Sequence, residues 1–296
     1  ATKKTDDFKK KLYCEMRSRI KEEDTSVPYF SNGYWYITRY EIGKEYPIYS
    51  RKKKTLDSEE EILFDCNDMA KDHEYFNLTG INVSPDNKKV AYAIDTLSRR
   101  KYTIYVKDLT SGKNLKTKLI NTSGSSVWDS GNRFLFYSRK NKKTLRSETI
   151  LRYDTFKDSE KKIFYEADET FSVYVSLSKS RDYIYISSYS TLTSEHRFIS
   201  SNKPFDKFKI IESRTKGLEY DIFHFGNFFY IHTNKDDANN FKLMRTLISA
   251  PSKKNWTDFI PHKKDILLED FELFEKYFTL TERRNGLKMI RVISWD

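Results

Sequence analysis

Histidine and carboxylate side chains are the first places to look for chemistry in this chain. The histidines are His73, His196, His224, His232 and His262. His224 and His232 fall on adjoining predicted strands and could form a metal-binding pair, although a partly buried structural histidine is the commoner role. The predicted loop carboxylates lack the Asp/Asn/Gly spacing of a calcium loop; they are Asp68, Asp72, Asp236 and Asp237. Neither C-x-x-C nor H-E-x-x-H occurs, so we predict no bound metal.

Motifs for nucleophilic or phosphate chemistry are absent from the sequence. It contains no G-x-S-x-G elbow, no G-x-G-x-x-G turn and no G-x-x-x-x-G-K-[ST] loop. The nearest string, Ser123-Gly124-Ser125-Ser126, stands where a repeat unit begins, and we predict a loop there. We therefore assign no catalytic residue and expect no cofactor.

The charge of the chain raises the question of a nucleic-acid partner. The 296 residues carry a formal net charge of +11. The basic clusters, however, are spread over several units and interleave with 43 acidic residues; they are 9–11, 51–54, 99–101 and 139–143. A solvated surface with lysines at strand edges explains this pattern. A nucleic-acid-binding domain, whose affinity would fall steeply with salt, is the weaker alternative.

The number of cysteines and the hydropathy of the sequence indicate the cellular compartment of the protein. Cys14 and Cys66 are the only cysteines, which is too few for a disulfide framework and fits a reducing compartment. No apolar run approaches the ~20 residues that a membrane span needs. We therefore expect a cytoplasmic protein without a membrane partner, or a periplasmic one if a leader has been removed.

A sequence pattern, a turn followed by an aromatic strand, recurs six times. These strands must position the histidine and carboxylate side chains described above. The six strands are 34–39, 89–94, 133–138, 182–187, 227–232 and 276–281. Their starts lie 44 to 55 residues apart, the length of a four-stranded propeller blade. Several are apolar at consecutive positions, as in Phe134-Leu135-Phe136-Tyr137, so both faces must be covered. Blades packed face to face provide that cover, whereas a two-sheet sandwich would show cleaner alternation.

The sequence that follows each of these aromatic strands predicts further strands. Third strands are predicted at 46–51, 102–107, 149–154, 195–200, 241–245 and 288–293. Fourth strands are predicted at 61–65, 115–120, 162–166, 208–212 and 257–260, and the sixth unit has none. We therefore predict an all-β fold, a β-propeller of four-stranded antiparallel blades with about six of an expected seven blades present. Its unfinished ends would expose apolar faces, which favours self-association or an open arc.

A short helix is predicted before the strands. Phe8, Leu12, Met16 and Ile20 recur every four residues within 8–22, as on one stripe of an amphipathic helix, and Asp6 or Asp7 is the expected cap. We divide the chain into an N-terminal helical segment at 1–26 and an incomplete propeller domain at 27–296.

Several strings resemble the oligopeptidase B branch of the prolyl oligopeptidase family of serine peptidases. The longest is 36–51, which resembles the hairpin of the first blade in that branch. Shorter matches follow in the family's order at 61–65, 83–87, 97–102, 168–171 and 267–271. Each string is weakly specific, but their order and spacing extend the resemblance from about residue 20 to the end of the sequence.

The resemblance implies a seven-bladed propeller that caps an α/β-hydrolase domain with a Ser/Asp/His triad and admits short peptides, which are cleaved after Lys or Arg. It covers only the helix and most of the propeller, so we place no triad residue here and expect this chain alone to be inactive. The implied partners are the C-terminal hydrolase domain and short basic peptides. The alternative is a stand-alone propeller that acts as a protein-binding platform.

Arg99 and Arg100 are the candidate site residues. They are adjacent in a predicted loop between two strands of one blade, inside a string that matches the family. One hypothesis places an arginine at the channel or the domain interface, where it would orient a peptide carboxylate or pair with the hydrolase domain. The other is a solvated hairpin, and both stay open.

Overall fold

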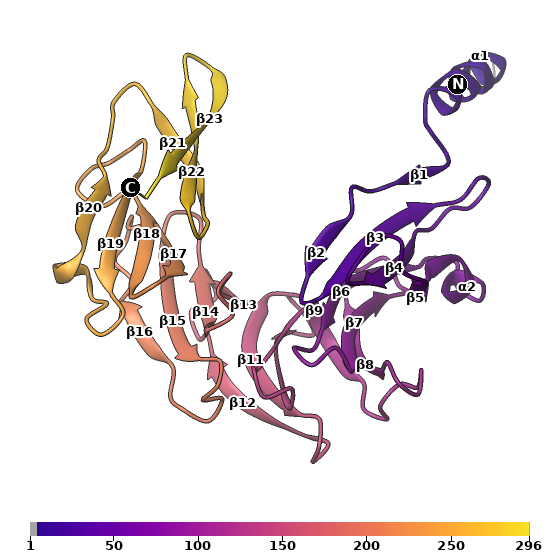
Figure 1. The fold of residues 1–296 in the computed structure, drawn as a ribbon, viewed down its shortest axis with the longest axis horizontal. Coiled ribbons are helices and arrows are strands. Elements are labelled where there is room, and N and C mark those ends of the chain that lie inside the picture. The colour runs from indigo at the N-terminus through magenta and orange to yellow at the C-terminus, as the bar shows by residue number, and fades with distance from the viewer. Residues whose placement is uncertain (1–4, 296) are drawn as a thin grey trace. The chain divides into compact units, whose positions relative to one another are not determined.

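A computed structural model describes residues 5–295 of the chain, and strands dominate it (Figure 1). Residues 1–4 of the predicted helical segment and residue 296 of the predicted propeller domain lie outside the described residues. The described chain forms two compact units. One comprises the residues up to Leu78 together with Asp95–Ser98, and the other comprises Thr79–Ile94 and the residues from Arg99 onward. No helix of the described part is long and apolar enough to cross a bilayer.

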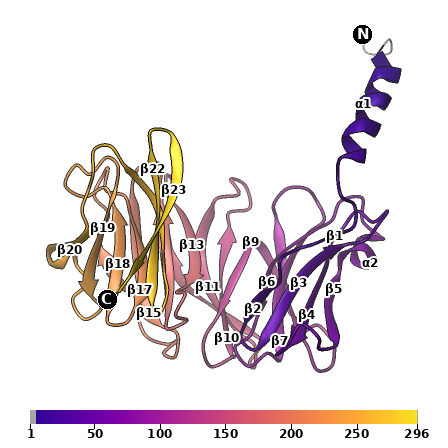
Figure 2. The same cartoon turned by 45° about the horizontal axis from the view of Figure 1, so that its top comes forward.

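The predicted N-terminal helix is present as α1, Asp6–Ser18. The expected caps were wrong: Asp6 and Asp7 lie in the first turn, and Thr5 is the N-cap without a side-chain capping bond. Carboxylates in the first turn still stabilise the helix, because they face the positive end of its dipole. The apolar stripe that includes Phe8 and Met16 is exposed, and Figure 2 shows α1 standing apart from the strands of its unit.

The first blade lies in the first unit. Its elements are β1 (Asp24–Thr25), β2 (Tyr29–Ser31), β3 (Tyr34–Tyr40), β4 (Ile48–Lys53), β5 (Glu60–Asp65) and α2 (Cys66–Ala70). β1 and β2 pair with opposite ends of the same edge of β3, so together they act as one interrupted strand. Asn32 and Gly33 form the β2–β3 turn with φ of 50° and 83°, and this pair of positive angles suits a tight hairpin.

The second and third blades share a strand. The elements are β6 (Asn77–Val83), β7 (Lys89–Asp95), β8 (Tyr102–Asp108), β9 (Leu119–Trp128), β10 (Phe134–Lys140), β11 (Ser147–Asp154) and β12 (Ser159–Tyr165), joined in one seven-stranded sheet. The beginning of β9 pairs with β8, and its end pairs with β10. The loop predicted at Ser123–Ser126 is therefore wrong. Asn121 and Gly124 have φ of 56° and 94°, which bends the strand from one blade into the next without ending it.

The last three blades are separate antiparallel sheets. The fourth contains β13 (Ser172–Leu177), β14 (Tyr183–Tyr189), β15 (Ser194–Ser200) and β16 (Lys209–Glu212). The fifth contains β17 (Tyr220–Phe225), β18 (Phe228–Thr233), β19 (Lys242–Leu247) and β20 (Thr257–Ile260). The sixth contains only β21 (Leu267–Leu273), β22 (Tyr277–Arg284) and β23 (Leu287–Ser294), as the sequence predicted. All six aromatic strands are present, and each lies inside its sheet between two partners.

The core of the second unit lies between successive blades. Leu135 and Tyr137 of β10 pack toward the second blade with Ala91 and Ile104, whereas Phe136 packs toward the fourth blade in a different cluster. Equivalent clusters join the fourth blade to the fifth and the fifth to the sixth. This arrangement explains the strands that are apolar at consecutive positions, since each buries both faces.

Candidate functional site

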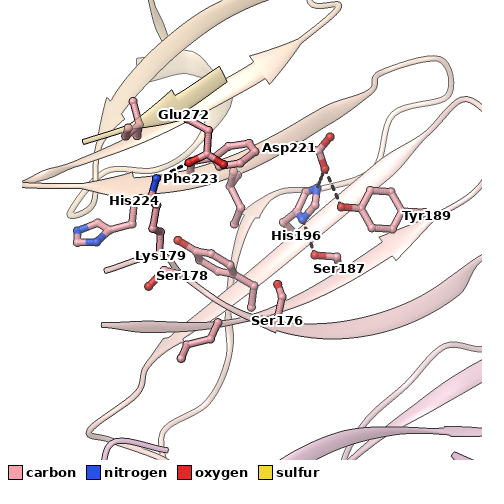
Figure 3. A pocket seen from close by; sticks show the side chains of 14 residues that line it. Ser176, Ser178, Lys179, Ser187, Tyr189, His196, Asp221, Phe223, His224 and Glu272 are labelled. Atoms are coloured by element: carbon pink, nitrogen blue, oxygen red, sulfur yellow. Dashed lines mark hydrogen bonds and ion pairs between the residues drawn. The ribbon is translucent and has the colours of Figure 1, made fainter. Parts of the chain in front are cut away.

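The first strands of the last three blades place polar side chains on one face. In β13, β17 and β21 alternate residues are buried in the blade cores. The residues between them face the other way, because side chains alternate along a strand. Ser176, Asp221 and Glu272 thus point away from the cores, whereas Phe223 packs against the core that joins the fifth blade to the sixth. All four line a cavity of about 540 Å³ within the second unit (Figure 3).

An ion pair crosses this cavity. Lys179, in the turn between β13 and β14, bonds to the Glu272 carboxylate of β21 (Figure 3). Its Nζ also lies 3.8 Å from the ring centroid of Phe274. The pair joins the fourth blade to the sixth, which are not neighbours in chain order. Both side chains are about half exposed, so the pair is accessible to solvent.

A buried histidine forms the floor beside Asp221. His196 of β15 donates a hydrogen bond from Nε2 to the carbonyl oxygen of Tyr220 at 2.6 Å. Its Nδ1 therefore accepts from the Ser187 hydroxyl at 2.8 Å. Asp221 Oδ1 lies 3.7 Å from Nε2 and accepts a bond from the Tyr189 hydroxyl at 2.6 Å. The histidine thus links two neighbouring blades.

Burial keeps His196 and Tyr189 in their neutral forms. It lowers the pKa of His196, and the Asp221 charge and the Tyr220 carbonyl only partly oppose it. Burial also raises the pKa of Tyr189, and the nearby Asp221 charge adds to the rise. His196 is therefore an uncharged link at neutral pH.

Ser187, His196 and Asp221 are not a catalytic triad. Ser187 lies in the middle of β14 and pairs with Tyr174 on one side and His196 on the other. The amides around it are therefore used by the sheet, whereas acyl transfer needs amides that point at the developing oxyanion. We assign a structural role to the three side chains.

The two histidines that could have formed a metal pair bind backbone instead. His224 Nε2 bonds to the carbonyl of Gly226 at 2.8 Å, and its Nδ1 bonds to the Ser180 hydroxyl at 2.7 Å. His232 Nε2 bonds to the carbonyl of Leu268 at 2.8 Å and its ring stacks on Phe241. Both are structural histidines. Within residues 5–295 no group of three or more His, Cys, Asp or Glu could hold a metal ion.

The loop carboxylates Asp68 and Asp236 form ion pairs with lysines, and the two cysteines are unpaired. Asp68 pairs with Lys71, and Asp236 pairs with Lys235 and Lys242. Cys14 is exposed on α1, whereas Cys66 is buried. Burial raises the pKa of the Cys66 thiol to about 12, so it stays protonated.

Arg99 and Arg100 lie in the exposed turn between β7 and β8. Arg100 has a φ of 54°, and its carbonyl oxygen accepts a hydrogen bond from Lys140 Nζ at 2.6 Å. Neither arginine lines the cavity of Figure 3. The turn is thus held by the third blade, and the role of the two side chains stays a prediction.

One of the matched strings, 168–171, is fixed by two arginines. Arg146 donates to the carbonyl of Phe171 at 2.7 Å. Arg214 lies over the Phe171 ring and bonds to Glu166 at 2.6 Å and to Glu195 at 3.0 Å. The two glutamates are each 5% exposed, so Arg214 neutralises two buried carboxylates. This string therefore joins two blades rather than forming a site.

Sequence reasoning missed Asp221, Glu272 and Lys179. A signal was present, because Asp221 and Glu272 stand at alternate positions between buried apolar residues on strands that open a blade. The pairing with Lys179 gave no signal, since 93 residues separate it from Glu272.

The whole chain, residues 1–296, matches the family model of the N-terminal β-propeller domain of prolyl oligopeptidase. Together with six antiparallel blades, this match shows that the chain belongs to the prolyl oligopeptidase family of peptidases.

Two relatives and one solved structure are similar to this chain over nearly its whole length. Dipeptidyl aminopeptidase BI from Pseudoxanthomonas mexicana is 35% identical, with 97% of this chain and 42% of the relative aligned. Protease 2 from Moraxella lacunata is 29% identical over 96% of this chain and 43% of the relative. The structure of oligopeptidase B from Leishmania major matches with a TM-score of 0.93 at 27% identity, covering 100% of this chain and 42% of that chain. The chain thus spans less than half of these relatives, and the predicted resemblance is confirmed.

Proposed function

We propose that the chain is the substrate-gating propeller of a serine oligopeptidase that cleaves short peptides after Lys or Arg. The observation that carries this proposal is the match to oligopeptidase B over the full length of this chain. The remaining 58% of that relative's length would hold the hydrolase domain with the Ser/Asp/His triad. We place the enzyme in the cytoplasm, because its two cysteines form no disulfide.

Two exposed apolar surfaces support a partner within the same polypeptide. α1 buries none of its residues. On β23, Leu287, Ile290 and Val292 are 64% to 71% exposed. Apolar areas of this kind on a folded domain usually mark contact with another surface. A hydrolase domain and a further blade would be suitable partners, and self-association would cover the same areas.

The 296-residue chain alone should show no turnover of peptides. A pure preparation would be assayed with a blocked Arg-Arg fluorogenic amide and with the same amide carrying a free amino terminus. The second substrate is included because one relative is named a dipeptidyl aminopeptidase. The polypeptide extended by the open reading frame after Asp296 should cleave at least one of them. Turnover by the short chain, or a reading frame without a G-x-S-x-G elbow, would contradict the proposal.

Replacement of both Arg99 and Arg100 with alanine should change the kinetics of the extended enzyme. If either side chain orients a peptide carboxylate or pairs with the hydrolase domain, kcat/KM for peptides should fall by about tenfold. Lys142→Ala, an exposed basic residue in another turn, is the control for a general loss of charge. Unchanged kcat and KM in the double variant would leave the solvated hairpin as the explanation.

A further inference from the structure

A second cavity lies between the fourth and fifth blades. Its lining comes from the starts of β14 and β16, the ends of β15 and β19, and the turns beside these strands. None of the residues that line it also lines the cavity of Figure 3. Its volume is about 560 Å³, which lies within the usual range of pockets that hold small-molecule ligands. It is therefore a separate candidate site.

Three lysines give this second cavity an excess of positive charge. Lys203, Lys207 and Lys209 line it, and within residues 5–295 their ammonium groups make no ion pair or hydrogen bond. The carboxylate in the lining is that of Asp206, so three positive charges face one negative charge. By contrast, Lys242 of the fifth blade is held by two carboxylates. Charges of one sign that line a concave surface attract ions of the opposite sign, so this cavity favours an anion.

The rest of the lining offers aromatic, aliphatic and unpaired polar groups. Tyr183 and Phe198 contribute two rings whose centroids are 5.7 Å apart, and Leu247 adds an aliphatic side chain that is 48% exposed. Asn227 and Ser249 also line the cavity, and neither side chain makes a hydrogen bond to another described residue. Aromatic side chains suit a planar ring, whereas an amide and a hydroxyl suit the hydroxyl groups of a ligand. The lining thus fits a ligand that is more than a simple anion.

We propose that this second cavity binds a nucleoside monophosphate, with the phosphate group at the three lysines. Lysine ammonium groups are compact point charges that bind phosphate oxygens. A phosphate monoester carries a charge of about −1.5 to −2 at neutral pH, which matches the excess of positive charge in the lining. In this arrangement the base lies against Tyr183 and Phe198, and the ribose hydroxyls bond to Asn227 and Ser249. Such binding needs no hydrolase domain, so it is independent of the proposed function.

The test is calorimetric titration of the 296-residue chain with adenosine 5′-monophosphate at low ionic strength. Adenosine, inorganic phosphate and phenyl phosphate each carry only part of this ligand and are the comparison ligands. Adenosine monophosphate should bind at least tenfold more tightly than any of them, because it alone reaches the lysines, the rings and the polar groups together. Equal binding of adenosine or of inorganic phosphate would overturn the proposal. Equally tight binding of phenyl phosphate would also overturn it, and would assign the cavity to an aryl phosphate such as a phosphorylated tyrosine.

Two double variants separate this site from the general charge of the protein. Lys203→Gln combined with Lys207→Gln should weaken the binding of adenosine monophosphate at least tenfold. Lys216→Gln combined with Lys254→Gln removes the same charge from exposed lysines outside the cavity lining, and it should leave the affinity unchanged. An equal loss in the two double variants would show non-specific attraction and contradict a built site.

Tryptophan fluorescence would confirm that each variant is folded. No peptidase activity enters the measurement, so an inactive extended enzyme would contradict the proposed function and leave this result intact. Conversely, a chain that bound no adenosine monophosphate would contradict this inference and leave the proposed function intact.

Discussion

Gly80→Ala should destabilise the protein by about 2 to 5 kcal/mol, the sum of two separate costs. Gly80 of β6 has a φ of 63°, a left-handed backbone that residues with a Cβ rarely adopt. A Cβ added there would lie 1.9 Å from the carbonyl oxygen of Gly124 in β9. The oxygen belongs to the backbone of β9 and the Cβ would be attached directly to the backbone of β6, so neither can move aside without shifting a strand.

The position is sensitive because two blades meet backbone to backbone beside it. Asn82 donates to the carbonyl of Ser126 at 2.6 Å, and Trp128 donates to the carbonyl of Asn82 at 2.9 Å. These bonds fix the separation of β6 and β9, which leaves no room for a methyl group.

Chemical unfolding followed by tryptophan fluorescence would measure the effect, since Trp128 is buried beside this contact. Gly112→Ala is the matched control. Gly112 lies in the same pair of blades with a φ of 70°, but a Cβ there would meet nothing within 4 Å. It should cost only about 1 to 2 kcal/mol, the price of the left-handed backbone alone. Equal losses in the two variants would show that the close approach of the strands has no energetic role.

Arg214→Ala should destabilise the protein by about 3 kcal/mol at neutral pH. The change leaves Glu166 and Glu195, each 5% exposed, without their shared guanidinium. Glu195 keeps its contact with Arg197 at 2.7 Å, and Glu166 keeps the amide of Asp168 at 3.1 Å. These remaining partners hold the expected loss near the low end of the range for a broken buried ion pair.

The loss should depend on pH with a defined sign. Burial tends to raise the pKa of Glu195, but the hydrogen bonds from Arg214 outweigh it and the pKa is lowered in the folded protein. A lowered folded pKa stabilises the protein above the ordinary value of 4.5, and this contribution disappears as the pH falls through the folded value. The difference between wild type and Arg214→Ala should therefore shrink below about pH 4.5.

Arg284→Ala is the control for the removal of an arginine. Its partner Asp265 is 61% exposed and the arginine itself is 53% exposed, so the pair is screened by water. This variant should unfold at the midpoint of the wild type. If Arg214→Ala also unfolded there, or if its deficit stayed constant with pH, the buried network would have no role in stability.

The sequence by itself determined the propeller, because the pattern that specifies it is local. Consecutive apolar residues in strands such as Phe134–Tyr137 require cover on both faces, and the 44- to 55-residue spacing repeats that requirement. The order and spacing of the short matching strings were enough to identify the family. Arg99 and Arg100 lie in a turn between two strands of one blade, as the sequence predicted, and their function stays a prediction.

Only the tertiary structure decided which distant side chains meet. The strand β9 continues through Ser123–Ser126, where the local sequence predicted a loop, because Gly80 and Gly124 let two backbones approach. Lys179 and Glu272 meet across 93 residues, and His196 reaches the carbonyl of the next blade. Such contacts follow from how one blade packs on another. A periodic sequence fixes the face on which a side chain lies, and the packing of the blades fixes its partner.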